Sequence, residues 1–107
     1  MLYVLLCYCD EATAPGAAST WGPLRYPRAE GMHRLMPTTA AVTLRRADGP
    51  VLDAAHAEAG EQLCAVLPLD AESNDAAIGI ARDLLRALPF TACEVRPVLP
   101  DPGPERA

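Results

Sequence analysis

Asp53 and His56 are the two residues of this sequence whose types and spacing best suit catalysis. A spacing of three puts both side chains on one side of a helical turn, where the carboxylate can accept a hydrogen bond from the imidazole N–H. That contact would fix the tautomer and raise the basicity of the ring, as a general base near neutral pH requires. The same pattern also suits a structural role, in which Asp53 caps an Ala-rich turn over residues 54–62 and His56 fills a partly buried position.

The second histidine, His33, is the other candidate for proton transfer. It follows a glycine in an expected loop, where a histidine is either a surface residue or, because loops often carry function, part of a site. If residues 12–31 fold over the pocket, His33 would serve there as the acid partner of another base. A metal shared by His33, His56 and Asp53 is an alternative that nothing in their spacing demands, so no metal site is predicted.

Arg96 is the leading candidate for substrate binding. It lies two residues after Glu94 on an expected strand, so the two side chains share a face. The guanidinium either pairs with Glu94 or anchors a carboxylate or enolate substrate. Tyr3 and Tyr8 belong to opposite faces of the expected first strand, so at most one of them lines a given pocket. Trp21, an anchor of the long loop, completes the substrate-binding candidates.

The cysteines indicate thiols more than a metal centre. Cys7, Cys9, Cys64 and Cys93 form no pair of CxxC motifs. They are expected to be small, buried and reduced, with a metal or redox site as the alternative. The sequence also lacks a Gly-rich phosphate loop, a nucleophile signature and a dinucleotide fingerprint. No cofactor is therefore predicted.

Composition narrows the class of protein. A chain of 107 residues suits one domain. Its 9 basic residues, all Arg, against 14 acidic ones give a net charge of −5, with no basic patch for nucleic acid. The opening "MLYVLLCYCDE" has no basic leader and is too short to span a bilayer. We therefore expect a cytoplasmic protein with neither a nucleic-acid nor a membrane partner.

Hydrophobic patterns predict four strands and one helix. The helix is expected over residues 74–88, capped by Ser73 or Asn74 and stopped by Pro89. Its apolar face is expected to hold Ile78, Ala81, Leu85 and Leu88. A hairpin is expected to turn at Asp48-Gly49, after a long loop that takes the place of a first helix. The strands are expected at residues 2–9, 39–46 with a return from 51, 63–69 and 91–98.

This order of elements predicts an α+β fold: a ferredoxin-like four-stranded antiparallel sheet whose first crossover helix is eroded to a loop. Residues 1–99 would form the single domain, and residues 100–107 a disordered tail. The helix covers one face of the sheet. A second copy of the chain is the simplest cover for the other, so a homodimer is predicted.

Five segments of the chain occur in the order of a known family: "MLYVLLCYCDEA", "LMPTTAAVTLRR", "LDAAHAEAGEQL", "LPLDAESNDAAIGIARDLL" and "CEVRPV". On these segments the chain resembles the YCII-related proteins, in particular the DGPF-domain branch. The similarity covers residues 1–12 and 35–98. The resemblance implies a dimeric α/β-barrel. It implies little about activity, although the broader group includes a dehydrochlorinase-type enzyme with a His–Asp pair.

The chain departs from that family in two places. Of the signature Asp-Gly-Pro-Phe, Asp53 is present, but Ala54, Ala55 and His56 replace the other three residues. The segment between Ala12 and Leu35 is too short and too rich in Pro and Gly for the usual first helix. That helix carries the family's catalytic histidine, so this role cannot be assigned to a residue here.

Two functions follow as hypotheses. The first is a small cofactor-independent enzyme that moves protons in a lyase, isomerase or cyclase step on a small, cyclic or aromatic metabolite. His56, oriented by Asp53, would be the base, and Arg96 or a tyrosine would stabilise the developing oxyanion. The second is a non-catalytic dimeric module that binds a small ligand or assists a partner enzyme.

Overall fold

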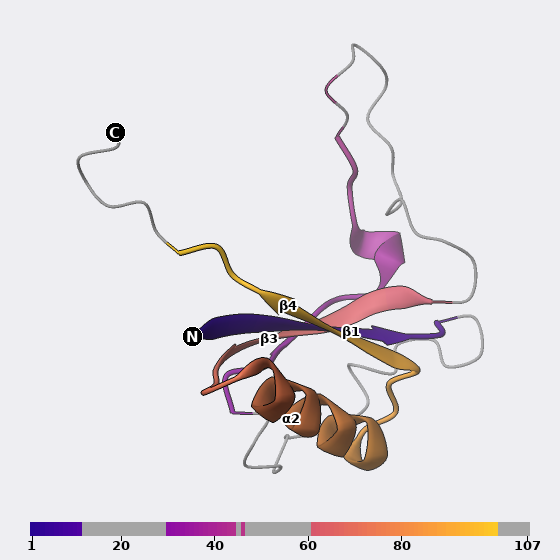
Figure 1. Ribbon diagram of the computed structural model, residues 1–107. Coiled ribbons are helices and arrows are strands. Elements are labelled where there is room, and N and C mark those ends of the chain that lie inside the picture. The colour runs from indigo at the N-terminus through magenta and orange to yellow at the C-terminus, as the bar shows by residue number, and fades with distance from the viewer. Residues whose placement is uncertain (12–29, 45, 47–60, 101–107) are drawn as a thin grey trace.

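The structure is a computed structural model that describes residues 1–11, 30–44, 46 and 61–100. These residues form an α+β unit with a four-stranded sheet of order β2-β3-β1-β4, in which every pairing is antiparallel. One α-helix among them packs on the sheet (Figure 1). The elements are β1 (Leu2–Cys9), β2 (His33–Arg34), the 3-10 helix η2 (Thr38–Ala40), β3 (Gln62–Asp70), α2 (Asn74–Ala87) and β4 (Ala92–Pro97).

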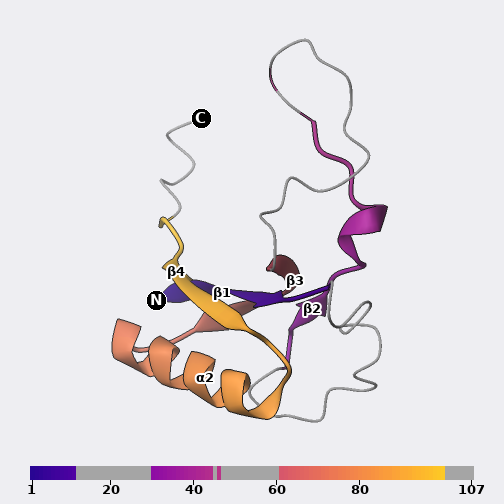
Figure 2. The ribbon, with the colours of Figure 1, turned by 90° about the vertical axis from the view of Figure 1, so that its right-hand side faces the viewer.

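The connection of β3 to β4 explains the arrangement of the sheet. Both strands pair with β1, one on each side, and both run antiparallel to it. They are therefore parallel to each other, and α2 provides the crossover between them on one face of the sheet (Figure 2). The expected α+β class and antiparallel sheet are confirmed, and the strand order is compatible with a ferredoxin-like fold.

The face of the sheet that α2 covers holds the core. The odd-numbered residues of β1 point to this face and are almost fully buried, and Leu5 and Cys7 expose nothing. They pack in one cluster with Leu67 of β3 and with Leu84 of α2. Burial of one such leucine contributes about 1.5–3 kcal/mol to folding. The packing of β1 and β3 against α2 therefore determines which face of the sheet is buried.

Local sequence signals fix both ends of α2. The Ser73 side chain accepts a hydrogen bond from the Ala76 N–H at 3.1 Å, so Ser73 is the N-cap. Asp75 lies in the first turn and Arg86 in the last, where each suits the helix dipole. The helix ends before Pro89, as expected.

The buried face of α2 differs from the predicted one. The fully buried residues are Ala77, Ala81 and Leu84, whereas Leu85 is 37% exposed and Ile78 only half-buried. Two adjacent leucines fit a 3.6-residue period almost equally well, and the packing of Leu84 against the sheet decides between them. The predicted place of Leu85 in the core is therefore wrong.

The predicted second strand over residues 39–46 is also wrong in position. The edge strand is His33–Arg34, paired with Val66 and Ala65 of β3, and residues 38–40 form η2. Pro37, with φ −56°, precedes η2, and the Ala40 N–H donates to the Pro37 carbonyl at 2.9 Å. A fixed φ and a closed turn at this point bend the chain out of the sheet. The expected Asp48-Gly49 turn, the return strand and residues 54–60 of the turn expected over 54–62 lie outside the described residues, and Gln62 already belongs to β3.

Pro68 occupies a position in β3 that needs no ladder donor. The Ala71 N–H donates to the Met1 carbonyl at 3.0 Å, which makes this an in-register hydrogen-bonded pair. Such pairs alternate along antiparallel strands, so Pro68, opposite Val4, falls in a non-hydrogen-bonded pair. The Pro68 nitrogen therefore points away from β1, toward the side of β3 on which β2 lies. There β2 pairs only with Ala65 and Val66, so no described strand lies opposite Pro68 on that side. The missing N–H of Pro68 therefore leaves no gap in the hydrogen bonds between β3 and its neighbours.

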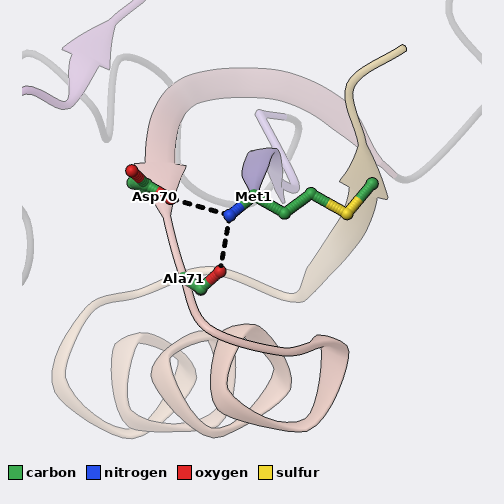
Figure 3. Close-up of polar contacts among 3 residues, drawn as sticks. All are labelled: Met1, Asp70 and Ala71. Atoms are coloured by element: carbon green, nitrogen blue, oxygen red, sulfur yellow. Dashed lines mark hydrogen bonds and ion pairs between the residues drawn. The ribbon is translucent and has the colours of Figure 1, made fainter. Parts of the chain in front are cut away.

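The start of β1 is tied to the end of β3 by the N-terminal amino group (Figure 3). This group lies 3.0 Å from Oδ1 of Asp70 and 3.1 Å from the carbonyl oxygen of Ala71. Both charged groups are at least half exposed. Such a pair contributes about 0–1 kcal/mol, and it helps to set the register at this end of the sheet.

Substitution of the two adjacent leucines of α2 tests the position of its buried face. Leu84→Ala should lower the free energy of unfolding by about 2–5 kcal/mol, because it opens a cavity beneath the sheet. Leu85→Ala removes the same atoms from a partly exposed position and should cost less than about 1 kcal/mol. Urea unfolding followed by circular dichroism measures both, and equal losses would contradict the packing.

Candidate functional site

The sheet face turned away from α2 carries the candidate site, and we call it the open face. Residues directly opposite each other on neighbouring strands point to the same side. The register therefore places one row of side chains across this face, from edge to edge. The row consists of His33, Val66, Leu6 and Glu94. Beside it lies a second row of Pro68, Val4 and Arg96.

The centre of the open face is apolar and its edges are polar. Val4, Leu6 and Val66 are half-buried, although α2 lies wholly on the other side of the sheet (Figure 2). His33 stands at the β2 edge, and Glu94 and Arg96 stand at the β4 edge. Apolar side chains with a few polar groups around them are the side-chain composition of a small-molecule site.

His33 is an exposed residue of β2, not a loop residue. Its side chain has no hydrogen-bond or ion-pair partner among the described residues. The pairing of β2 with β3 directs it to the open face beside Val66. The ring is therefore available for contact with a ligand or a second chain.

Arg96 and Glu94 form an ion pair on the open face, as one of the two sequence readings expected. Glu94 is half-buried, while the Arg96 side chain is 67% exposed. One carboxylate leaves part of the five-donor guanidinium free for a second acceptor. Arg96 can thus pair with Glu94 and still contact a carboxylate ligand.

The two tyrosines of β1 lie on opposite faces of the sheet, as predicted. Tyr3 is 3% exposed and packs against Ala71 and Ala77 on the helix side. Tyr8 is half-buried on the side of Arg96. Of the two candidates, Tyr8 is therefore the one that shares a face with Arg96.

Three of the candidate residues lie outside the part of the chain that the structure describes: Asp53, His56 and Trp21. The proposed hydrogen bond between Asp53 and His56 remains a prediction. The described chain resumes at residue 61, and β3 begins at Gln62, opposite Cys9.

A polar cluster at the end of β1 has no counterpart in the sequence-based predictions. The Glu11 carboxylate accepts hydrogen bonds from the Thr38 hydroxyl at 2.6 Å and from the Thr38 N–H at 3.1 Å. The Glu11 N–H donates to Oε1 of Gln62 at 2.8 Å. These residues come from three distant parts of the chain, so no local pattern announces them. The cluster fastens η2 to the sheet.

The segment over residues 35–44, which we call the arm, leaves the sheet on the side opposite α2 (Figures 1 and 2). Three large apolar residues of the arm are highly exposed: Met36, Val42 and Leu44, at 72%, 63% and 74%. Single exposed apolar residues are ordinary, whereas several on one segment suit a contact with another surface. The arm thus lies on the same side of the sheet as the open face (Figure 2).

Metal ligands do not gather in the described part of the chain, where no group of three or more His, Cys, Asp or Glu side chains could hold an ion. Nor does any helix within that part have the length and apolar character needed to cross a membrane.

Comparison with known proteins gives one informative match. The chain is 39% identical over 118 residues to the uncharacterized protein R00369 of Rhizobium meliloti (strain 1021), and the alignment covers 92% of each chain. Because the aligned length exceeds the 107 residues of this chain, the relative carries residues that have no counterpart here. No family model matches the chain.

The Glu11 cluster can be tested with two neighbouring threonines. Thr38→Val removes a hydroxyl that donates to a partly buried carboxylate and should lower the free energy of unfolding by about 1.5–3 kcal/mol. Thr39→Val makes the same change at an exposed residue and should alter it by no more than about 0.5 kcal/mol. Urea unfolding of the two variants measures the difference, and equal stability would remove the cluster from its role.

Proposed function

This chain belongs to the same family as R00369 of Rhizobium meliloti, and we propose that it is a small cofactor-independent enzyme of the dimeric α/β-barrel type. Its substrate is a small metabolite with an acidic or enolisable group, bound on the open face, and its reaction is a proton transfer of the lyase, isomerase or cyclase kind. The observation that carries the proposal is the half-buried apolar floor flanked by His33, Tyr8 and Arg96.

Kinship with the YCII-related, DGPF-domain proteins is part of this proposal. The strand order β2-β3-β1-β4 and the single described crossover through α2 support it, because both suit a ferredoxin-like unit.

A second copy of the chain is the proposed cover of the open face. A two-fold axis parallel to the strands would lay β2 of one copy over β4 of the other. His33 of each copy would then face the Glu94 carboxylate of the other copy, and Val4, Leu6 and Val66 would meet across the axis. The exposed apolar residues of the arm lie on the same side and would extend the contact. Such an interface is self-complementary, as a two-fold dimer requires.

The dimer would enclose a pocket beside the apolar residues that meet across the axis, where Tyr8 and Arg96 lie on the open face. Removal of water strengthens the attraction between Arg96 and an anionic group of the substrate. In that pocket His56, oriented by Asp53, is the proposed base, and His33 is the acid partner. Arg96 and the Tyr8 hydroxyl would stabilise negative charge that develops on the substrate oxygen.

A non-catalytic ligand-binding module is the second candidate. The placement of His33 favours it, because no described carboxylate bonds to that imidazole and Glu94 is engaged with Arg96. A binding site needs only the apolar floor and the guanidinium, whereas catalysis needs an oriented base. The two candidates differ in turnover and not in the location of the site.

A cytoplasmic location is proposed on the state of the thiols. All four cysteines are free in the structure, although two of them are adjacent on paired strands. Reduced thiols are typical of proteins in reducing compartments.

The proposed dimer predicts that a charge added on the open face prevents dimer formation, whereas the same charge on the outer side of α2 does not. Leu6→Glu places a carboxylate at the centre of the open face, so the protein should sediment as a monomer because burial of unpaired charge is costly. Leu85→Glu adds the same charge on the outer side of α2 and should leave the dimer intact. Circular dichroism checks that both variants fold. A wild-type monomer in analytical ultracentrifugation, or a Leu6→Glu dimer, would contradict the interface.

The proposed chemistry predicts exchange of carbon-bound hydrogen with solvent. Wild-type protein in D₂O should incorporate deuterium into a member of a panel of small hydroxy acids, keto acids and phenols, as mass spectrometry would detect. His56→Gln should slow the exchange by about 10²–10⁴-fold, the usual contribution of a general base.

Arg82→Gln, on the exposed side of α2, is the matched control and should exchange at the wild-type rate. Equal exchange by wild type and His56→Gln would remove His56 from the reaction. Panel members that raise the melting temperature without any exchange would favour the binding module.

A further inference from the structure

The strongest unassigned chemistry in the described part of the chain is a pair of thiols on the covered face of the sheet. Cys7 of β1 and Cys93 of β4 are direct partners in the strand register. Their Sγ atoms lie 3.7 Å apart and share a hydrogen bond. Cys7 is fully buried, whereas Cys93 is half-buried on the edge strand of the sheet. Cys93 is thus the more exposed residue of the pair, and Cys7 lies directly behind it.

The backbone at this pair has the geometry that a disulfide requires. The Val98 N–H donates to the Leu2 carbonyl at 2.9 Å, in register with the pairing of β1 and β4. Because hydrogen-bonded pairs alternate, Cys7 and Cys93 occupy a non-hydrogen-bonded pair, as does Pro97 opposite Tyr3. Cα atoms in such a pair are about 4.5 Å apart, within the range that a disulfide spans.

Bond formation would need only a small movement. The two sulfurs must approach by about 1.7 Å to reach an S–S length of about 2.05 Å, which side-chain rotation can supply. We propose that Cys7 and Cys93 are a redox modification site that forms a reversible disulfide on contact with a hydroperoxide. Cys93 is the thiol that reacts with the oxidant, and Cys7 is the resolving thiol.

Each step balances. The Cys93 thiolate attacks the distal oxygen of ROOH, the O–O bond breaks, and the products are ROH and a Cys93 sulfenic acid. The Cys7 sulfur then attacks the Cys93 sulfur, the S–O bond breaks, and water leaves with the proton of Cys7. In total two thiols lose two electrons, and ROOH becomes ROH and water. A small dithiol restores both thiols by exchange.

The electrostatics of the pair agree with this division of roles. The hydrogen bond from Cys7 lowers the pKa of the Cys93 thiol. The same hydrogen bond, together with burial, raises the pKa of Cys7. The thiolate, which is the form that attacks a peroxide, is therefore favoured on Cys93 over Cys7.

A second pair on the same face provides an internal comparison. Cys9 and Cys64 are each 2% exposed, and burial followed by a hydrogen bond with Cys9 raises the pKa of Cys64. Neither sulfur is accessible to an oxidant from solvent. This pair should remain reduced under conditions that oxidise Cys7 and Cys93.

The experiment is a count of thiols after mild oxidation of the native protein. Wild-type protein is exposed to a small molar excess of hydrogen peroxide, then denatured and alkylated. Two of its four cysteines should escape alkylation, and tandem mass spectrometry should find Cys7 joined to Cys93. Dithiothreitol added before alkylation should return the count to four.

Three variants separate the roles, each checked for folding by circular dichroism. Cys93→Ser should leave all three remaining thiols alkylated, while Cys64→Ala should still form the link. Cys7→Ala should accumulate a Cys93 sulfenic acid that a cyclic 1,3-dione traps. Four alkylated thiols in oxidised wild type, a link between Cys9 and Cys64, or a link that persists in Cys93→Ser would each overturn the proposal.

Discussion

The alternation of side chains along β1 is the constraint on which the rest of this structure depends. β1 pairs on both sides, with β3 and β4, so neither of its edges is free. Its odd-numbered residues must then enter the core beneath α2, and its even-numbered residues must line the open face. A shift of one residue in register would exchange the two sets and would expose Leu5 and Cys7.

The two faces separate two kinds of chemistry. On the covered face, β1 and β4 bring Cys7 and Cys93 into direct contact within an apolar core. On the open face, the same strands present Tyr8 and Arg96 beside an apolar floor. Because Arg96 and Cys93 lie on one edge strand, a link at Cys93 would restrain the strand that carries the guanidinium. Redox state and ligand binding would then act through the same element.

Much of the fold could be predicted from sequence, because its signals are local. β1 is a continuous apolar run, and α2 has a serine cap and a terminating proline. β2 could not be found in this way: a strand of two residues exists only through its pairing with β3. The contact between Glu11 and Thr38, 27 residues apart, is likewise a product of tertiary structure. Which of Leu84 and Leu85 enters the core depends on how α2 packs against the sheet, and the helical period alone does not determine it.

The candidate site was predictable in part for the same reason. Strand alternation alone places Glu94 with Arg96 and separates Tyr3 from Tyr8, as the structure confirms. The position of His33 on the open face depends on the pairing of β2, which no local pattern announces.

The most direct test of the account is an isotope-filtered NOE experiment on a mixture of methyl-labelled and unlabelled chains. Contacts between chains should arise from the methyl groups of Val4, Leu6 and Val66 and be absent for Leu5 and Leu67. No contact between chains, or contacts confined to the outer side of α2, would contradict the claim that a second copy covers the open face.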